Sequence, residues 1–206
     1  PSPPRFYAAS CILCDSRVHL ATVRTLTMPA NLLRISLLIL LLTAFALRMA
    51  YLDASSLWSD EGHTWALIQR SYGQIAVDTA SDIHPPGYYW LLKSWTSLVG
   101  TSAAGMRTFS VWTALLLVAL IYRIGIQVGS RAKSVYSGRL LGVLAAFVAA
   151  VNPFQIFYAQ EARMYMLLTL AAALLSYGLI LYMQAESATV VGQSTRANNP
   201  HRLLVV

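Results

Sequence analysis

The sequence predicts an all-α, polytopic membrane protein with about four transmembrane helices and two interfacial helices in its first outer loop. Of the 206 residues, 57% are hydrophobic and only 11% are charged, a balance outside that of ordinary soluble domains. Several apolar runs are long enough to cross about 30 Å of hydrocarbon. The basic residues, which give a net charge of +7, are scattered between these runs. They indicate membrane topology and exclude a nucleic-acid-binding stripe.

The first 30 residues are expected to form a cytoplasmic, poorly ordered extension, because residues 1–27 show no sustained apolar period. Met28 precedes the first apolar run as a natural start of translation would. Cys11 and Cys14 form an isolated C-x-x-C motif with no second pair at zinc-site spacing. We interpret them as incidental thiols.

Four spans are predicted in order. The first occupies residues 35–52 if the charged end of Arg48 reaches the membrane interface. A cleaved signal peptide is the open alternative for this run, because its apolar core is short. The other three spans are expected at residues 108–129, 140–160 and 164–185.

Charge placement predicts the orientation of these spans. The short basic segments 130–139 and 186–202 are expected in the cytoplasm, and four crossings then place the N-terminus there too. Residues 31–184 thus form the transmembrane domain, and 185–206 form a cytoplasmic loop that ends at the start of another hydrophobic segment, as in a fragment. This topology faces six of the eight acidic residues outward: Asp53, Asp60, Glu61, Asp78, Asp82 and Glu161.

The first outer loop, residues 53–105, is rich in Trp and Tyr, which prefer the headgroup level of a bilayer. Apolar residues repeat at helical spacing from Trp65 to Ala76 and again from Tyr88 to Val99. We therefore predict two helices lying in the interface plane. A span over residues 88–106 would place the basic segment 130–139 outside, so charge bias argues against it.

Asp60 and Glu61 stand at the start of the first interfacial helix, where the helix dipole keeps a carboxylate ionised. These residues either cap the helix or provide a general base that takes a proton from an acceptor hydroxyl. Two adjacent acids also permit one of them to position the acceptor or a divalent cation.

His84 opens a rigid His-Pro-Pro-Gly segment, in which each proline restricts its own backbone and that of the preceding residue. The segment either only separates the two interfacial helices or aims His84 at the carboxylates.

A third polar segment lies where the third span meets the outer surface, and it contains Tyr158, Glu161, Arg163 and Tyr165. If residues 158–165 are helical, Tyr158, Glu161 and Tyr165 share a face and Arg163 points elsewhere. Arg163 either pairs with a carboxylate between helices or binds a phosphate, which suits guanidinium geometry.

Three motifs together resemble the family 39 glycosyltransferases, which include protein O-mannosyltransferases and lipid A aminoarabinose transferases and have the GT-C membrane architecture. The motifs are Leu57-Trp-Ser-Asp-Glu61, Asp82-Ile-His-Pro-Pro-Gly-Tyr-Tyr-Trp90 and Tyr158-Ala-Gln-Glu-Ala-Arg-Met-Tyr165. The resemblance covers about residues 31–184 and departs from the family in length, because members are roughly twice as long or more.

The resemblance implies an inverting transfer of sugar from a polyprenyl-phosphate carrier to an acceptor hydroxyl on a protein, lipid or glycan, at the outer face of the cell membrane. It assigns the base to Asp60, with Glu61 beside it. It makes His84, Tyr158, Glu161, Arg163 and Tyr165 candidates for binding substrate, and Arg163 or Lys93 would stabilise the phosphate charge.

Two other classes stay open: a transporter whose charged residues line a path, and a non-catalytic membrane scaffold. Spans almost free of ionisable residues argue against the transporter. No cofactor or metal site is predicted with certainty, although a divalent cation fits the adjacent acids. Lipid bilayer and lipid-linked sugar are the expected partners, and nucleic acid is not.

Overall fold

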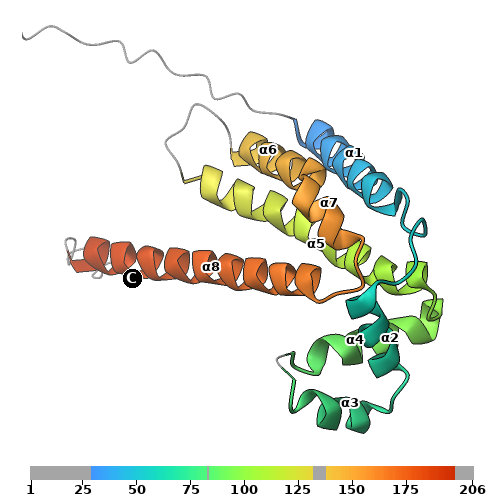
Figure 1. Cartoon of the computed structure of the whole chain (residues 1–206). Helices are drawn as coiled ribbons and strands as arrows, with labels where there is room; N and C mark the ends of the chain where they lie inside the picture. Colours follow the sequence, from blue (N-terminus) through green and yellow to red (C-terminus); the bar gives the residue numbers. More distant parts are fainter. Residues whose placement is uncertain (1–28, 83, 132–137, 198–206) are drawn as a thin grey trace, which may run out of the picture.

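The computed structural model describes residues 29–82, 84–131 and 138–197, and these residues form eight helices without a strand. The all-α prediction is therefore confirmed for the described part of the chain (Figure 1). The helices are α1 (Ala30–Met49), α2 (Ser59–Ile68), α3 (Tyr72–Thr79), α4 (Gly87–Val99), α5 (Ala103–Gly129), α6 (Gly138–Val151), α7 (Pro153–Ala159) and α8 (Tyr165–Ala197).

Helix α5 is the centre of a bundle, since it packs against α1, α6 and α8. Close approach of α5 to α6 depends on facing glycines: a Cβ added to Gly125 would lie 2.8 Å from the Cα of Gly142. The side-chain amide of Gln127 in α5 also donates a hydrogen bond to the side-chain carbonyl oxygen of Gln184 in α8. Helices α1, α5 and α8 are each long and apolar enough to cross a membrane. Helices α6 and α7 are long and apolar enough only as a bent pair, which is either a broken span or a re-entrant loop.

The third span predicted over residues 140–160 corresponds to two helices, α6 and α7, instead of one straight helix. Helices α6 and α7 meet at an angle of 57°, because Pro153 has no N–H group with which to continue the helical hydrogen bonds. Asn152 begins the new helix, and its side chain accepts a hydrogen bond from the backbone N–H of Gln155 at 3.1 Å. The proline break thus changes the direction of the chain between α6 and α7.

Two other predicted boundaries also differ from the structure. The first interfacial helix is divided into α2 and α3, because Ser71 caps α3 by accepting a hydrogen bond from the backbone N–H of Gln74 at 3.2 Å. Helix α8 continues to Ala197 where a loop was expected after residue 185, and no proline interrupts the chain before Pro200. The helix predicted from Tyr88 to Val99 is confirmed as α4.

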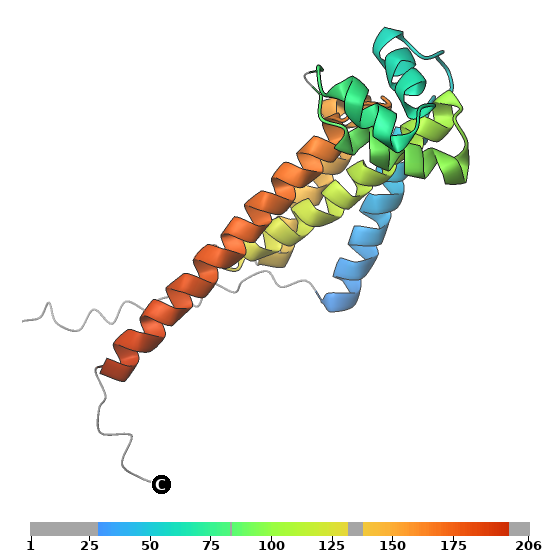
Figure 2. The ribbon, with the colours of Figure 1, turned by 90° about the horizontal axis from the view of Figure 1, so that it is seen from below.

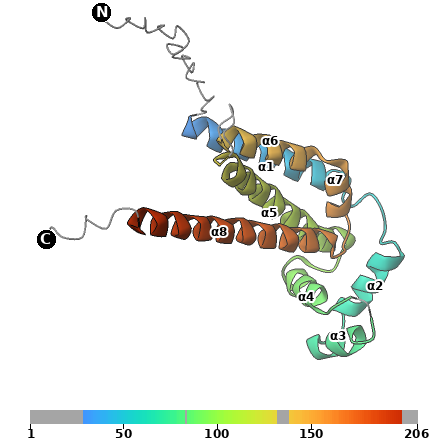
Figure 3. The same ribbon diagram turned by 90° about the vertical axis from the view of Figure 1, so that its left-hand side faces the viewer.

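Helices α2, α3 and α4 form a three-helix cap at one end of the bundle (Figures 1 and 3). Figure 2 shows that α6 begins, and α8 ends, away from this cap. The six acidic residues that were predicted to lie on one side of the membrane belong to the cap or to its junctions with the bundle. The predicted extension before residue 29, its two cysteines and residues 198–206 lie outside the described residues.

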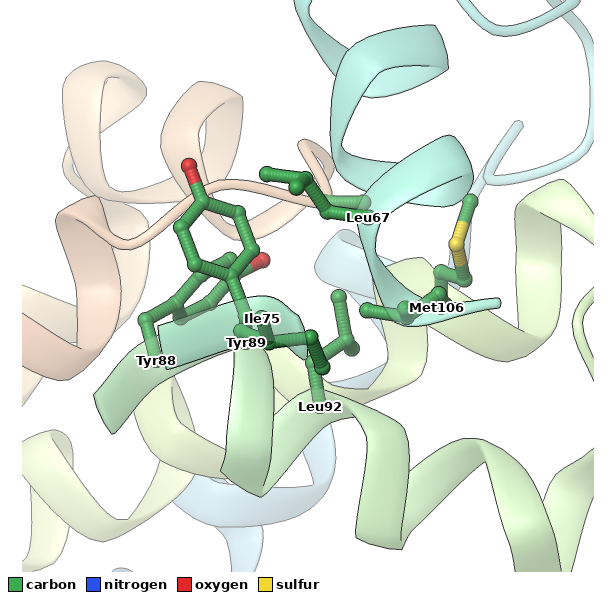
Figure 4. Close-up of a cluster of buried hydrophobic side chains, with 8 residues drawn as sticks. Leu67, Ile75, Tyr88, Tyr89, Leu92 and Met106 are labelled. Atoms are coloured by element: carbon green, nitrogen blue, oxygen red, sulfur yellow. The ribbon is translucent and has the colours of Figure 1, made fainter. Parts of the chain in front are cut away.

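The cap has its own hydrophobic core, which also holds it to α5. Figure 4 shows Leu67, Ile75, Tyr89 and Leu92 in one cluster with Met106, which belongs to the first turn of α5. Each of these side chains is at most 5% exposed. Burial of this apolar surface, at about 25 cal/mol per Å², fixes the cap on the end of the bundle.

Truncation of Leu92 tests this core against an adjacent control. Leu92→Ala is expected to destabilise the cap by about 2–5 kcal/mol, because it empties a fully buried site. Leu91→Ala, on a side chain that is 50% exposed, is expected to lower stability by less than about 1 kcal/mol. Thermal unfolding of purified variants in one detergent measures both, and equal losses would contradict this packing.

Candidate active site

Glu61 is the third residue of α2 and is fully buried. Its carboxylate accepts hydrogen bonds from Nε of Arg107 at 3.0 Å and from Nη2 of Arg107 at 2.6 Å. It also accepts from the backbone N–H of Ala162 at 2.7 Å. This bidentate pair therefore joins the cap, the first turn of α5 and the junction of α7 with α8.

Arg107 has further acceptors in the link between α1 and α2. Its Nη1 donates to the carbonyl oxygens of Leu52 at 2.8 Å and Ser55 at 2.9 Å, and its Nη2 donates to that of Ser56 at 3.2 Å. The guanidinium is nearly as buried as its partner, with a side chain that is 4% exposed. Arg107 thus fixes the course of the chain from the first span into the cap.

The surroundings of Glu61 hold the pKa of its carboxyl below the ordinary value. Burial acts in the opposite direction, but the hydrogen bonds and charge of Arg107 outweigh it, together with the N–H groups of Ala162 and Trp58. Trp58 is the N-cap residue of α2, and its backbone N–H interacts with the Glu61 carboxylate as in a helix capping box. Glu61 is consequently ionised and fully committed to structure.

Asp60 has a different environment from its neighbour. Its carboxylate is 3.3 Å from Nη2 of Arg163 and its side chain is 43% exposed, whereas that of Arg163 is 7% exposed. Arg163 lies over the ring of Tyr165, 5.9 Å from its centroid, and Tyr165 packs edge-on against Tyr158 at 4.9 Å. The pair Asp60–Arg163 therefore combines an accessible carboxylate with a well-anchored cation.

Next to these residues is a cavity of about 480 Å³, which we call the acidic cavity. Its lining residues are Ser55, Trp58, Glu61, Arg107, Phe157, Gln160 and Glu161. Burial and the nearby charge of Glu61 raise the pKa of the Glu161 carboxyl. The backbone of Glu161 is fixed by the hydroxyl of Ser110, which donates to its carbonyl oxygen at 2.6 Å.

A second hollow of about 380 Å³, which we call the apolar groove, lies between the start of α4 and the start of α8. It is lined by His84, Pro85, Tyr88, Met164, Leu167, Leu168 and Ala171. His84 is 3.5 Å from the carboxylate of Asp82. The groove is mainly apolar, with His84 and Tyr88 as its polar members.

Three hydrogen-bond donors near this groove are buried and lack a partner among the described residues: the hydroxyls of Tyr88 and Tyr89, and Nε of Arg163. Burial raises the pKa of both tyrosines, so each keeps its proton at neutral pH. The Arg163 charge acts on both phenols. Buried polar groups are rarely left unpaired, so these donors are candidates for ligand contacts.

The structure brings together most, but not all, of the residues predicted to form a site. Asp60 pairs with Arg163, and Glu61 and Glu161 line the same cavity. Tyr165 lies under Arg163 and packs against Tyr158, and His84 lines the apolar groove. Lys93 lies apart: its Nζ donates to the carbonyl oxygen of Ile68 at 2.8 Å and faces the ring of Tyr72. Lys93 therefore ties α4 to the end of α2.

Residues 158–165 do not form the single helix that would have placed Tyr158, Glu161 and Tyr165 on one face, since α7 ends at Ala159 and α8 begins at Tyr165. In the non-helical segment between them, Glu161 lines the acidic cavity and Arg163 pairs with Asp60. Sequence reasoning also missed Arg107. Its signal was a lone basic residue at the start of a span, on the side where acidic residues predominate.

Within the described part of the chain, no three His, Cys, Asp or Glu side chains are arranged to hold a metal ion. No protein-family model, curated protein or solved structure matches this chain. The resemblance described in the sequence analysis therefore depends on the three motifs alone.

Glu61→Gln is expected to destabilise the protein by about 3–5 kcal/mol, because it leaves the buried Arg107 without a counter-charge. Asp60→Asn is the matched control: it removes the adjacent carboxylate from a partly exposed pair, and its expected effect is below about 1 kcal/mol. Thermal unfolding in detergent at neutral pH compares the two variants. A larger loss for Asp60→Asn would refute this assignment of roles.

Acidification is expected to weaken the wild-type protein through Glu61. Because its pKa is lowered in the folded state, Glu61 contributes stability above the ordinary glutamate pKa of about 4.3 and loses it as the pH falls through the folded value. The difference in melting temperature between wild type and Glu61→Gln should therefore shrink as the pH falls below about 4.3. A constant difference from pH 7 to pH 3 would contradict this linkage.

Proposed function

We propose that this protein transfers a sugar from a polyprenyl-phosphate donor to an acceptor hydroxyl at the outer face of the cell membrane, with inversion at the anomeric carbon. One observation carries the proposal. The three motifs, which are separated by tens of residues in the sequence, meet at one end of an apolar helix bundle. Asp60 of the first contacts Arg163 of the third, and His84 of the second shares a groove with Met164.

Asp60 is the proposed general base. Its carboxylate is accessible, and Arg163 orients it, whereas Glu61 is fully occupied by Arg107 and Ala162. In one displacement, the acceptor oxygen forms a bond to the anomeric carbon while the bond from that carbon to the phosphate oxygen breaks. Asp60 takes the hydroxyl proton, and the lipid phosphate leaves with the bonding electron pair.

The donor phosphate fits the unpartnered donors. Arg163 Nε, Tyr88 and Tyr89 together offer one fixed positive charge and two neutral hydroxyls, which match the acceptor oxygens of a phosphate diester. The apolar groove beside them would hold the first isoprene units of the lipid, with His84 at its rim. A phosphate is already a good leaving group, so this scheme requires no acid that protonates it.

The acidic cavity is the proposed place of the transferred sugar. Trp58 and Phe157 provide apolar faces for a sugar ring, and Gln160 and Glu161 provide hydrogen-bonding groups for its hydroxyls. The remaining wall of Glu61 and Arg107 is rigid. Positioning of a bound sugar next to Asp60 is the contribution that such a preformed cavity makes to the rate.

The test is sugar transfer from radiolabelled polyprenyl-phosphate sugars by membranes that contain matched amounts of each variant. Asp60→Asn is expected to lower transfer at least about 100-fold, the lower range for loss of a general base. Arg163→Gln should lower transfer mainly through weaker donor binding. Lys93→Gln is the control, because Lys93 lies outside the site, and it should retain wild-type activity.

Retention of transfer by Asp60→Asn would refute the assigned base. No transfer by the wild type, with any of several donor sugars, would refute the proposed reaction. A transport path or a scaffold role at the same charged residues would then be the better account, and flux of polar solutes into vesicles would separate these two.

A further inference from the structure

Arg48, in the last turn of α1, is a fully buried charge that the reaction above does not use. Its Nη1 donates to the carbonyl oxygens of Ala150 at 2.9 Å and Ala44 at 3.1 Å, and its Nη2 donates to that of Ala149 at 3.1 Å. Ala149 and Ala150 are in the last turn of α6. A guanidinium is stabilised here by the negative end of the α6 dipole.

These carbonyl groups need a donor because of Pro153. In an unbroken helix the N–H of residue 153 would bond the carbonyl oxygen of Ala149, but proline has no such N–H. Asn152 also departs from helical geometry, with a ψ of 122°. The carbonyl oxygen of Ala150 therefore lacks its helical backbone N–H donor as well. Arg48 supplies both missing donors from another helix.

Gln160 makes the reciprocal contact at the end of α7. Its Nε2 donates to the carbonyl oxygen of Ala50 at 2.8 Å, and to those of Leu47 and Arg48 at 3.3 Å. These oxygens belong to the C-terminal end of α1. The end of α1 and the broken span therefore cap each other, and the same Gln160 lines the acidic cavity.

We propose that Arg48 and Gln160 are positioning residues, which hold the bend between α6 and α7 and thereby set the wall of the acidic cavity. The expected effect on sugar transfer rests on the proposed function, whereas the role of Arg48 in holding the bend does not. The bend directs α7 so that Phe157, Gln160 and Glu161 face Glu61 and Arg107 across the cavity. The buried charge of Arg48 has acceptors because the bend leaves the carbonyl oxygens of Ala149 and Ala150 without backbone donors.

Two readouts test this assignment: amide hydrogen exchange of residues 153–162 in lipid nanodiscs, and sugar transfer. Arg48→Met removes the guanidinium N–H donors and keeps an unbranched apolar side chain in the buried site. Exchange in this segment should become at least about tenfold faster, the factor that one charge-assisted hydrogen bond supplies. Transfer should fall about 100-fold in kcat, as a cavity wall displaced by about 1 Å predicts, with a smaller change in KM for the lipid donor.

Arg123→Met is the control, because Arg123 is an exposed basic residue of α5, and it should leave exchange of residues 153–162 unchanged. Arg48→Lys should restore part of both readouts, since an ammonium can reach some of the same carbonyl oxygens. The decisive variant combines Arg48→Met with Pro153→Ala, which gives the Ala149 carbonyl oxygen a backbone donor again.

In this double variant we expect slow exchange to return without transfer, because the span is hydrogen-bonded but no longer bent. Recovery of both exchange and transfer would overturn the positioning role, and so would unchanged exchange in Arg48→Met. Absence of transfer by the wild type would instead refute the proposed reaction. Exchange in the single and double variants would then still decide whether Arg48 holds the bend.

Discussion

The buried ion pair between Glu61 and Arg107 is the interaction on which the rest of the site depends. Through it, the link after α1, the start of α2, the first turn of α5 and the chain at Ala162 all meet within hydrogen-bond distance. A buried pair of this kind contributes little net free energy compared with an apolar core, but loss of one partner is very unfavourable. Its role is therefore specificity: it allows one placement of the cap on the bundle.

This constraint also separates the functions of two adjacent carboxylates. Glu61 accepts hydrogen bonds from Arg107 and Ala162 and has a lowered pKa, so its role is structural. Asp60, one residue earlier on the same helix turn, points toward Arg163 and solvent. Reactivity then follows from environment alone, because the two side chains have the same chemistry. In the proposed reaction, the fixed Glu61 would keep the accessible carboxylate of Asp60 in place.

Much of the architecture could be predicted from sequence because its causes are local. Apolar runs located α1, α5 and α8, helical periodicity located α4, and the positions of acidic and basic residues placed the three motifs at one end. The bend at Pro153 and the division at Ser71 were missed because apolar periodicity continues through both. The partners of Glu61 and Arg48 lie 46 and about 100 residues away, a separation that no local pattern reports. For the same reason Lys93 was grouped with residues that it does not meet.

A thermodynamic double-mutant cycle on Glu61 and Arg107 tests the central claim most directly. Glu61→Gln, Arg107→Gln and the double variant would be compared by unfolding in the same detergent at neutral pH. If the pair holds the cap on the bundle, the double variant should be less destabilised than the sum of the single variants by at least about 2 kcal/mol. Additive losses would mean that the two residues act independently, and would contradict the placement of the site described here.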